Sequence, residues 1–126
     1  MSNPKKYYWL KLFDNFFADP KIKKLRRLAG GDTYIVILLK LMLQTVKNDG
    51  IYEYQGIENT LAKELELVID ENEEHILAVL IYLEKTKLIE EVKNGYFLLT
   101  QVPLMLGSEG SSAERMRRLR ESNVTL

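Results

Sequence analysis

The sequence predicts a single α+β domain, mainly helical, that ends in a β-hairpin. The chain has 126 residues, a hydrophobic fraction of 46% and a charged fraction of 29%, which is typical of one soluble globular domain. Apolar residues recur with helical spacing in most of residues 20–85. An Asn-Gly pair at residues 94–95 separates two strand-like runs, which is the sharpest local signal in the chain.

The first predicted helix is short and basic. Asp19 is suited to cap it and Pro20 to fill its first position. Apolar residues then recur every three positions up to Leu28, with Lys and Arg between them. Gly30 and Gly31 follow, and we expect them to end this helix.

The second predicted helix is central and buried. Asp32 or Thr33 caps it, and residues 35–46 are apolar on nearly every side. The polar turn-forming residues 48–50 reverse the chain. A short strand follows over residues 51–54.

Two closely spaced helices come next. The first is expected from residue 57 or 58 to Leu67, with its glutamates, including Glu64, off the apolar face. The second is expected to begin at Asp70, which forms a capping box with Glu73, and to continue to about Lys85.

The predicted hairpin joins residues 88–92 to residues 96–99 through Lys93, Asn94 and Gly95. Helix, helix, short strand, helix, helix and hairpin is the element order of a winged helix-turn-helix, in which the hairpin is the wing. We expect this domain to occupy residues 1–106. Residues 107–126 are expected to form a flexible linker and a basic tail.

Composition argues against most catalytic chemistry. The chain has no cysteine and one histidine, His75, whose helical neighbour Glu71 is its best potential metal partner. A single such pair is weak, and no nucleotide-binding glycine motif is present. We therefore predict no enzyme activity, catalytic residue, metal or cofactor.

The longest apolar run, residues 34–39, is too short to span a membrane, and the first residues lack a signal peptide's apolar stretch.

Charge is balanced in total but segregated along the chain. Residues 1–28 carry eight Lys and Arg against two Asp, a net +6, whereas residues 70–91 carry a net −5. This pattern indicates an anion-binding surface in one part and a different partner for another, or simply scattered solvated charge.

The candidate DNA contacts are residues able to neutralise phosphate without reading sequence. They lie on the first helix, at the start of the third, at the hairpin tip and in the tail. They are Lys21, Lys23, Lys24, Arg26, Arg27, Asn59, Thr60, Lys93, Arg115, Arg117, Arg118 and Arg120.

The helix before the hairpin departs from a simple DNA reader. Residues 70–74 contain four carboxylates, which repel a phosphate backbone. Residues 76–83 are apolar over more than one stripe, which implies a second buried surface. We interpret Val79 and Tyr82 as a self-association surface; the alternative is that both pack under the hairpin.

Aromatic residues concentrate in residues 7–17. We interpret them as core residues, although an aromatic cluster can also stack on single-stranded bases. Exposed Tyr7 or Tyr8 could also contribute to a subunit interface.

Several motifs extend over nearly the whole chain. They are Tyr8-Trp9-Leu10-Lys11-Leu12, Phe16-Phe17, Pro20-Lys21-Ile22-Lys23, Gly31-Asp32-Thr33-Tyr34 and Ser112-Ala113-Glu114-Arg115-Met116-Arg117. Together they resemble the N-terminal domain of phage replisome organisers, which is similar to the winged-helix domain of DnaD-type primosomal proteins.

The resemblance implies a phage or prophage replication-initiation protein in the cytoplasm of a bacterial host. It implies binding to double-stranded origin DNA, self-association, and recruitment of replication proteins such as a helicase loader. It also implies a further carboxy-terminal part. Two alternatives remain: an oligomerisation module with little DNA affinity, or a transcription regulator, against which the acidic residues 70–74 count.

Overall fold

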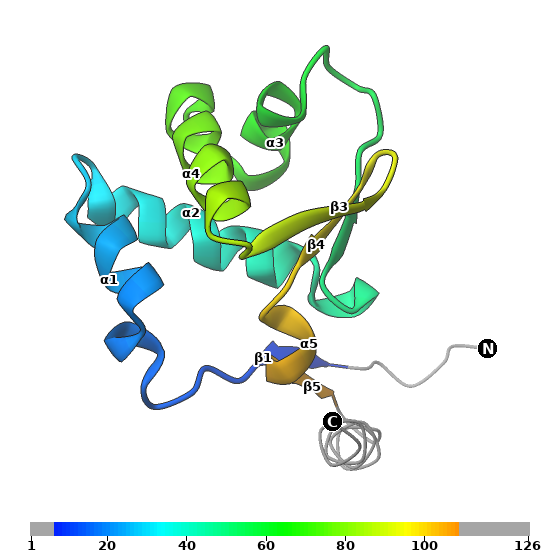
Figure 1. Ribbon diagram of the computed structural model, residues 1–126. Helices are drawn as coiled ribbons and strands as arrows, with labels where there is room; N and C mark the ends of the chain where they lie inside the picture. Colours follow the sequence, from blue (N-terminus) through cyan, green and yellow to red (C-terminus); the bar gives the residue numbers. More distant parts are fainter. Residues whose placement is uncertain (1–6, 109–126) are drawn as a thin grey trace.

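The computed structural model describes residues 7–108 and confirms an α+β domain (Figure 1). Its helical elements are η1 (Phe16–Ala18), α1 (Pro20–Arg27), α2 (Gly31–Gln44), η2 (Val46–Asn48), α3 (Leu61–Ile69), α4 (Glu73–Lys85) and α5 (Val102–Met105). Its strands are β1 (Tyr8–Leu10), β2 (Ile51–Glu53), β3 (Ile89–Lys93), β4 (Tyr96–Leu99) and β5 (Leu106–Ser108).

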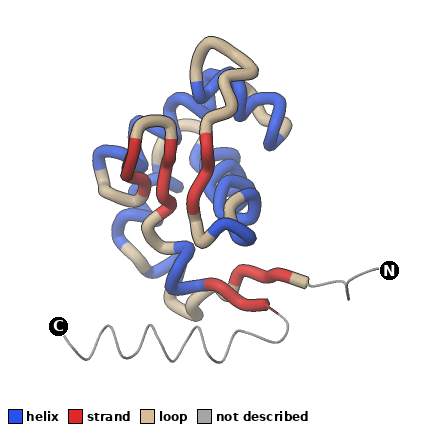
Figure 2. The backbone as a smooth tube through the Cα atoms, turned by 90° about the vertical axis from the view of Figure 1, so that its right-hand side faces the viewer, coloured by secondary structure: helices blue, strands red, loops and turns tan. Residues whose placement is uncertain are grey.

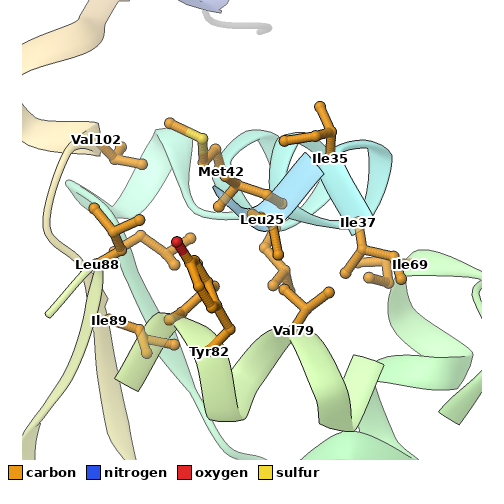
Figure 3. Close-up of a cluster of buried hydrophobic side chains, with 14 of the residues drawn as sticks. Leu25, Ile35, Ile37, Met42, Ile69, Val79, Tyr82, Leu88, Ile89 and Val102 are labelled. Carbon is orange, nitrogen blue, oxygen red and sulfur yellow. The ribbon is translucent and has the colours of Figure 1, made fainter. Parts of the chain in front are cut away.

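Helix α2 lies at the centre of the domain, as predicted. Its residues Ile37 and Leu38 are fully buried, and α1, α3 and α4 all contact it. Figure 3 shows the side chains of α1, α2 and α4 meeting in one cluster, with Leu25 and Val79 at its middle. This burial of apolar surface is the main stabilising contribution to the arrangement.

The predicted hairpin is confirmed. Strands β3 and β4 pair antiparallel up to Lys93 and Tyr96, and β2 adds to the other edge of β4, in the order β2-β4-β3 (Figure 2). Gly95 has a φ of 83°, a conformation that favours glycine, so the Asn94-Gly95 pair explains where the chain turns.

A second, two-stranded sheet joins the two ends of the described chain. Strand β1 pairs with β5, with Tyr8 opposite Ser108 and Leu10 opposite Leu106. Gly107 and Ser108 therefore belong to a strand, not to the linker in which we placed them. The glycine is required by packing: a Cβ atom at position 107 would lie 2.0 Å from the Trp9 Nε1 atom. The remainder of the predicted tail lies outside the described residues.

Two helices begin at other residues than predicted. Helix α2 starts at Gly31, with Gly30 as its N-cap in a left-handed conformation (φ 84°). Position 31 packs against the end of α1, where a side chain would collide with the carbonyl of Arg26. Helix α3 starts only at Leu61, and Thr60 caps it by accepting a hydrogen bond from the Lys63 amide. Asn59 and Thr60 thus precede α3 instead of lying within it.

The capping box predicted for α4 is wrong. Asn72, not Asp70, is the N-cap, and its side chain accepts hydrogen bonds from the amides of Glu74 and His75. Asp70 adopts a left-handed conformation (φ 57°) that ends α3. Asp and Asn are favoured both as N-caps and in the left-handed conformation that ends a helix, so the spacing of Asp70 and Asn72 does not show which residue takes which role.

The amino-terminal aromatic residues are mostly exposed, which corrects their interpretation as core. Phe16 is buried, but Trp9, Phe13 and Phe17 are 37%, 47% and 49% exposed. This stretch is a short strand, a turn and one turn of 3-10 helix laid along the surface (Figure 1). Such a segment directs only part of its side chains inward.

A buried carboxylate ties the loop after β2 to helix α3. Glu64 is fully buried, and its oxygens accept hydrogen bonds from the Tyr52 hydroxyl (2.5 Å) and the amides of Gln55 and Ile57 (both 2.9 Å). Burial by itself raises the pKa of Glu64, but these hydrogen bonds outweigh it and hold the pKa below its usual value. Glu64 is therefore an ionised structural anchor, although the sequence placed it off the apolar face.

Replacing this carboxylate should destabilise the domain in a pH-dependent manner. We expect Glu64→Gln to lower the free energy of unfolding by about 2 kcal/mol at neutral pH, because buried amides lose charged acceptors. Since the folded pKa is depressed, the stabilisation is present above the pKa of the unfolded carboxyl and lost on acidification.

Urea denaturation between pH 7 and pH 3 measures this effect. The wild-type chain should lose more stability on acidification than Glu64→Gln does. Glu90→Gln, which changes an exposed glutamate of β3, is the control and should behave as wild type. Parallel pH curves for wild type and Glu64→Gln would contradict an ionised anchor.

Candidate nucleic-acid interface

Helix α1 presents a dense set of cations. The Asp19 side chain caps it by accepting a hydrogen bond from the Lys21 amide at 2.8 Å, and Ile22 and Leu25 are fully buried. The remaining positions carry the predicted phosphate-binding residues, all of which are exposed: Lys21, Lys23, Lys24, Arg26 and Arg27.

Two hydrogen bonds hold α1 against the carboxy-terminal end of α4. The Tyr82 hydroxyl donates to the carbonyl of Lys21, and the Lys21 ammonium donates to the carbonyl of Thr86 at 2.7 Å. Burial and then the negative charge of Asp19 raise the pKa of Tyr82, which favours the protonated hydroxyl that donates this hydrogen bond. Lys21 thus has a structural role besides its charge.

This junction adds two cations that the sequence analysis missed. Lys85 and Lys87 are exposed and flank Thr86, the residue bound by Lys21. Both belong to the strongly acidic segment 70–91, and counting charge by segment therefore concealed them. A cationic last turn on the predicted fourth helix is the signal that could have found them.

Arg26 has a nearby anion. Its Nε donates to the Asp32 carboxylate at 3.0 Å, with the two side chains 59% and 86% exposed. Ion pairs this exposed contribute little stability and exchange readily with other anions. Arg26 therefore remains able to bind phosphate.

The two helix residues predicted at a self-association surface are not on the surface. Val79 is fully buried and Tyr82 is 9% exposed, both inside the cluster of Figure 3. That prediction is wrong, because α4 packs against α2, α3 and the hairpin and is bonded to α1 through Tyr82, so that it buries a broad apolar sector. Tyr7 is exposed, whereas Tyr8 is half-buried below the Lys47 ammonium.

The other predicted DNA contacts are separate from α1. Lys93 lies at the hairpin tip, with its ammonium 4.9 Å from the centre of the Tyr96 ring, and Figure 1 shows this tip and α1 on opposite sides of the molecule. Asn59 and Thr60 lie in the exposed loop before α3. The tail arginines lie outside the described residues.

A groove lies between α3, α4 and the hairpin. Its volume is about 370 Å³, and Leu77 and Ile81 of α4 are half-exposed in it. Among the described residues, the charged ones that line it are Glu73, Glu84 and Glu91. An apolar surface among carboxylates repels phosphate and suits a protein partner.

The His75 and Glu71 pair does not come together as a site. The Lys40 ammonium binds Glu71 at 2.6 Å and the carbonyl of Ile69 at 3.0 Å, which fixes the α3–α4 turn. His75 instead makes an edge contact with the Tyr34 ring. Within residues 7–108, no group of three or more potential metal-binding side chains gathers.

The described part of the chain contains no helix with both the length and the apolar character needed to cross a bilayer.

Comparison with known proteins agrees with the sequence motifs. The family model described as "N-terminal phage replisome organiser" matches residues 9–125. The chain belongs to this family. The match covers nearly the whole chain and confirms the resemblance to replisome organisers noted in the sequence. No curated protein and no solved structure matches the chain.

The position of α1 depends on a glycine that can be tested. A Cβ atom at Gly31 would lie 1.7 Å from the carbonyl oxygen of Arg26, so Gly31→Ala must displace the end of α1. We expect a loss of about 3 kcal/mol or more, measured by thermal or urea denaturation. Gly56→Ala is the control, since φ is +74° but the space is open, and should lose only about 1 kcal/mol. Equal losses would contradict the steric account.

Proposed function

We propose that this replisome organiser domain is a DNA-binding module of phage replication initiation whose main contact is α1. The observation that carries the proposal is the exposure of all five cations of α1, with Lys85 and Lys87 beside them. Closely spaced Lys and Arg side chains bind the phosphate backbone through charge and counterion release. We expect no catalytic step and no cofactor.

The fold supports a winged helix-turn-helix. Helices α3 and α4 follow one another across a tight turn, and the β3–β4 hairpin, with β2 at its edge, takes the place of the wing. In such domains the helix before the wing normally enters the major groove. Here that helix exposes Glu74, His75, Leu77, Ile81 and Glu84 along most of its length, and its exposed cation, Lys85, lies at the end that joins α1. Carboxylates repel phosphate and apolar side chains do not bind it. We therefore assign DNA contact to α1 in place of α4.

Further contacts belong to the same proposal. Lys93 would reach a phosphate separately from α1, and Asn59 and Thr60 would touch the backbone from the loop before α3. Arg115, Arg117, Arg118 and Arg120 would add a basic arm. We propose that the module acts at origin DNA in the cytoplasm of a bacterial host, together with replication proteins such as a helicase loader.

Neutralising α1 should weaken binding to double-stranded DNA. We expect a Lys23→Gln/Lys24→Gln/Arg27→Gln variant to lose most of its affinity at low salt, and the slope of log affinity against log salt to fall by roughly 2–3. Fluorescence anisotropy with a labelled random-sequence duplex measures both quantities. These side chains are exposed, whereas the buried side of α1 is formed by Ile22 and Leu25, which the variant keeps.

The matched control is Glu74→Gln/Glu84→Gln, which removes two charges from the exposed face of α4. It should leave duplex affinity unchanged or raise it slightly. If the control changed affinity more than the α1 variant did, DNA contact through α1 would be wrong.

A second candidate function is protein binding or self-association through the groove beside α4. The half-exposed Leu77 and Ile81 among three carboxylates support it. A buried apolar centre with a polar rim is the usual anatomy of a protein interface. Exposed Tyr7, together with Tyr8, remains a further candidate contact between copies.

Substituting the groove should reduce self-association. We expect Ile81→Glu to shift the chain toward the monomer in sedimentation velocity at high protein concentration, because it places a charge in the apolar floor. Leu67→Glu changes an even more exposed leucine of α3 that does not line the groove, and should not alter the distribution. An unchanged distribution for Ile81→Glu would exclude the groove as the self-association surface.

A further inference from the structure

A hollow beside α1 combines an exposed aromatic ring with cations. Its volume is about 350 Å³, and its lining residues are Phe17, Ile22, Lys23, Arg26 and Arg27. Phe17 is 49% exposed, whereas the adjacent Phe16 is buried. The hollow is therefore lined by a half-exposed phenylalanine and by three positively charged side chains.

The structure holds the Phe17 ring in place without covering it. The rings of Phe16 and Phe17 meet edge to face, with centroids 5.0 Å apart and planes at 89°. Because Phe16 is anchored in the core, this contact orders the neighbouring ring. An exposed ring that is already ordered loses little conformational entropy when a ligand packs on it.

We propose that this hollow binds unpaired bases of single-stranded DNA. A base stacks on Phe17, while Lys23, Arg26 and Arg27 neutralise phosphates of the same strand. This inference rests on the proposed function, since it uses the cations of α1. It goes further by assigning a form of DNA: bases inside a duplex are already stacked and cannot reach Phe17, so single strands gain a contact that duplexes lack.

Charge favours a nucleic acid over an apolar protein segment at this site. Covering Lys23, Arg26 and Arg27 with an apolar partner would remove three cations from water without compensation, which is costly. A single strand supplies both phosphates for the cations and flat apolar bases for the ring. The Arg26–Asp32 pair does not oppose this, because it is exposed and exchanges easily with phosphate.

Anisotropy with the full 126-residue chain tests the proposal, using labelled oligothymidylate and a random-sequence duplex of the same length. Phe17→Leu, which keeps an apolar side chain but removes the ring, should weaken oligothymidylate binding at least about fivefold. Its duplex affinity should stay within about twofold of wild type. Phe17→Tyr, which keeps a ring, should retain wild-type affinity for both.

Phe13→Ala is the matched control. Its ring is 47% exposed but lines a different hollow, which contains Asp19 and none of the α1 cations. It should leave both affinities unchanged. Circular dichroism melting of each variant establishes that a change in affinity is not a change in folding.

The outcomes separate this inference from the function beneath it. Equal oligothymidylate affinities for Phe17→Leu and wild type, with duplex binding still dependent on α1, would overturn stacking alone. Binding of neither nucleic acid at low salt would overturn both proposals. A loss shared equally by Phe17→Leu and Phe13→Ala would show a general apolar surface and would also overturn the assigned site.

Discussion

The Tyr82 hydroxyl is the point on which the arrangement of the two surfaces depends. It lies at the edge of the core and donates to the carbonyl of Lys21, while Lys21 donates to the carbonyl of Thr86. These two bonds fix the basic helix α1 across the end of α4. Burial and the negative charge of Asp19 raise the pKa of this hydroxyl further above the neutral range, in which a tyrosine is a donor in any case.

On either side of that junction the protein presents two surfaces of opposite charge. One end of α4 carries Lys85 and joins α1, whereas its exposed face carries Glu74 and Glu84 beside an apolar groove. The sign of the surface potential decides which partner each region can accept. A polyanion fits the α1 side, and a protein fits the groove.

Strong local signals predicted much of the fold. Asp19 and Pro20 begin α1, and the Asn94-Gly95 turn forms the hairpin. These features could be predicted because each depends only on residues adjacent in the sequence. Tertiary contacts explain the failures. The burial of Glu64 depends on amide donors from a loop seven to nine residues away, and no helical pattern shows that a glutamate will find them.

The candidate site was predicted less completely than the fold. The cations of α1 could be identified from composition alone, since charged residues remain exposed by default. The exposure of Phe17 and the position of Lys85 could not be predicted from the sequence, because both depend on how the amino-terminal segment and α4 pack around α1. For Val79 and Tyr82 the apolar sequence pattern correctly indicated burial. It did not show that they are buried inside this domain and not against a second copy of the chain.

The most direct test of the account is to map a bound DNA duplex on the isotopically labelled chain by amide chemical-shift changes in NMR. The account predicts that shifts concentrate in residues 20–28 and around Lys85 and Lys87, and that the exposed face of α4 from Glu74 to Ile81 is unaffected. Shifts centred on that face of α4, with α1 unchanged, would contradict it and restore α4 as the DNA-reading helix.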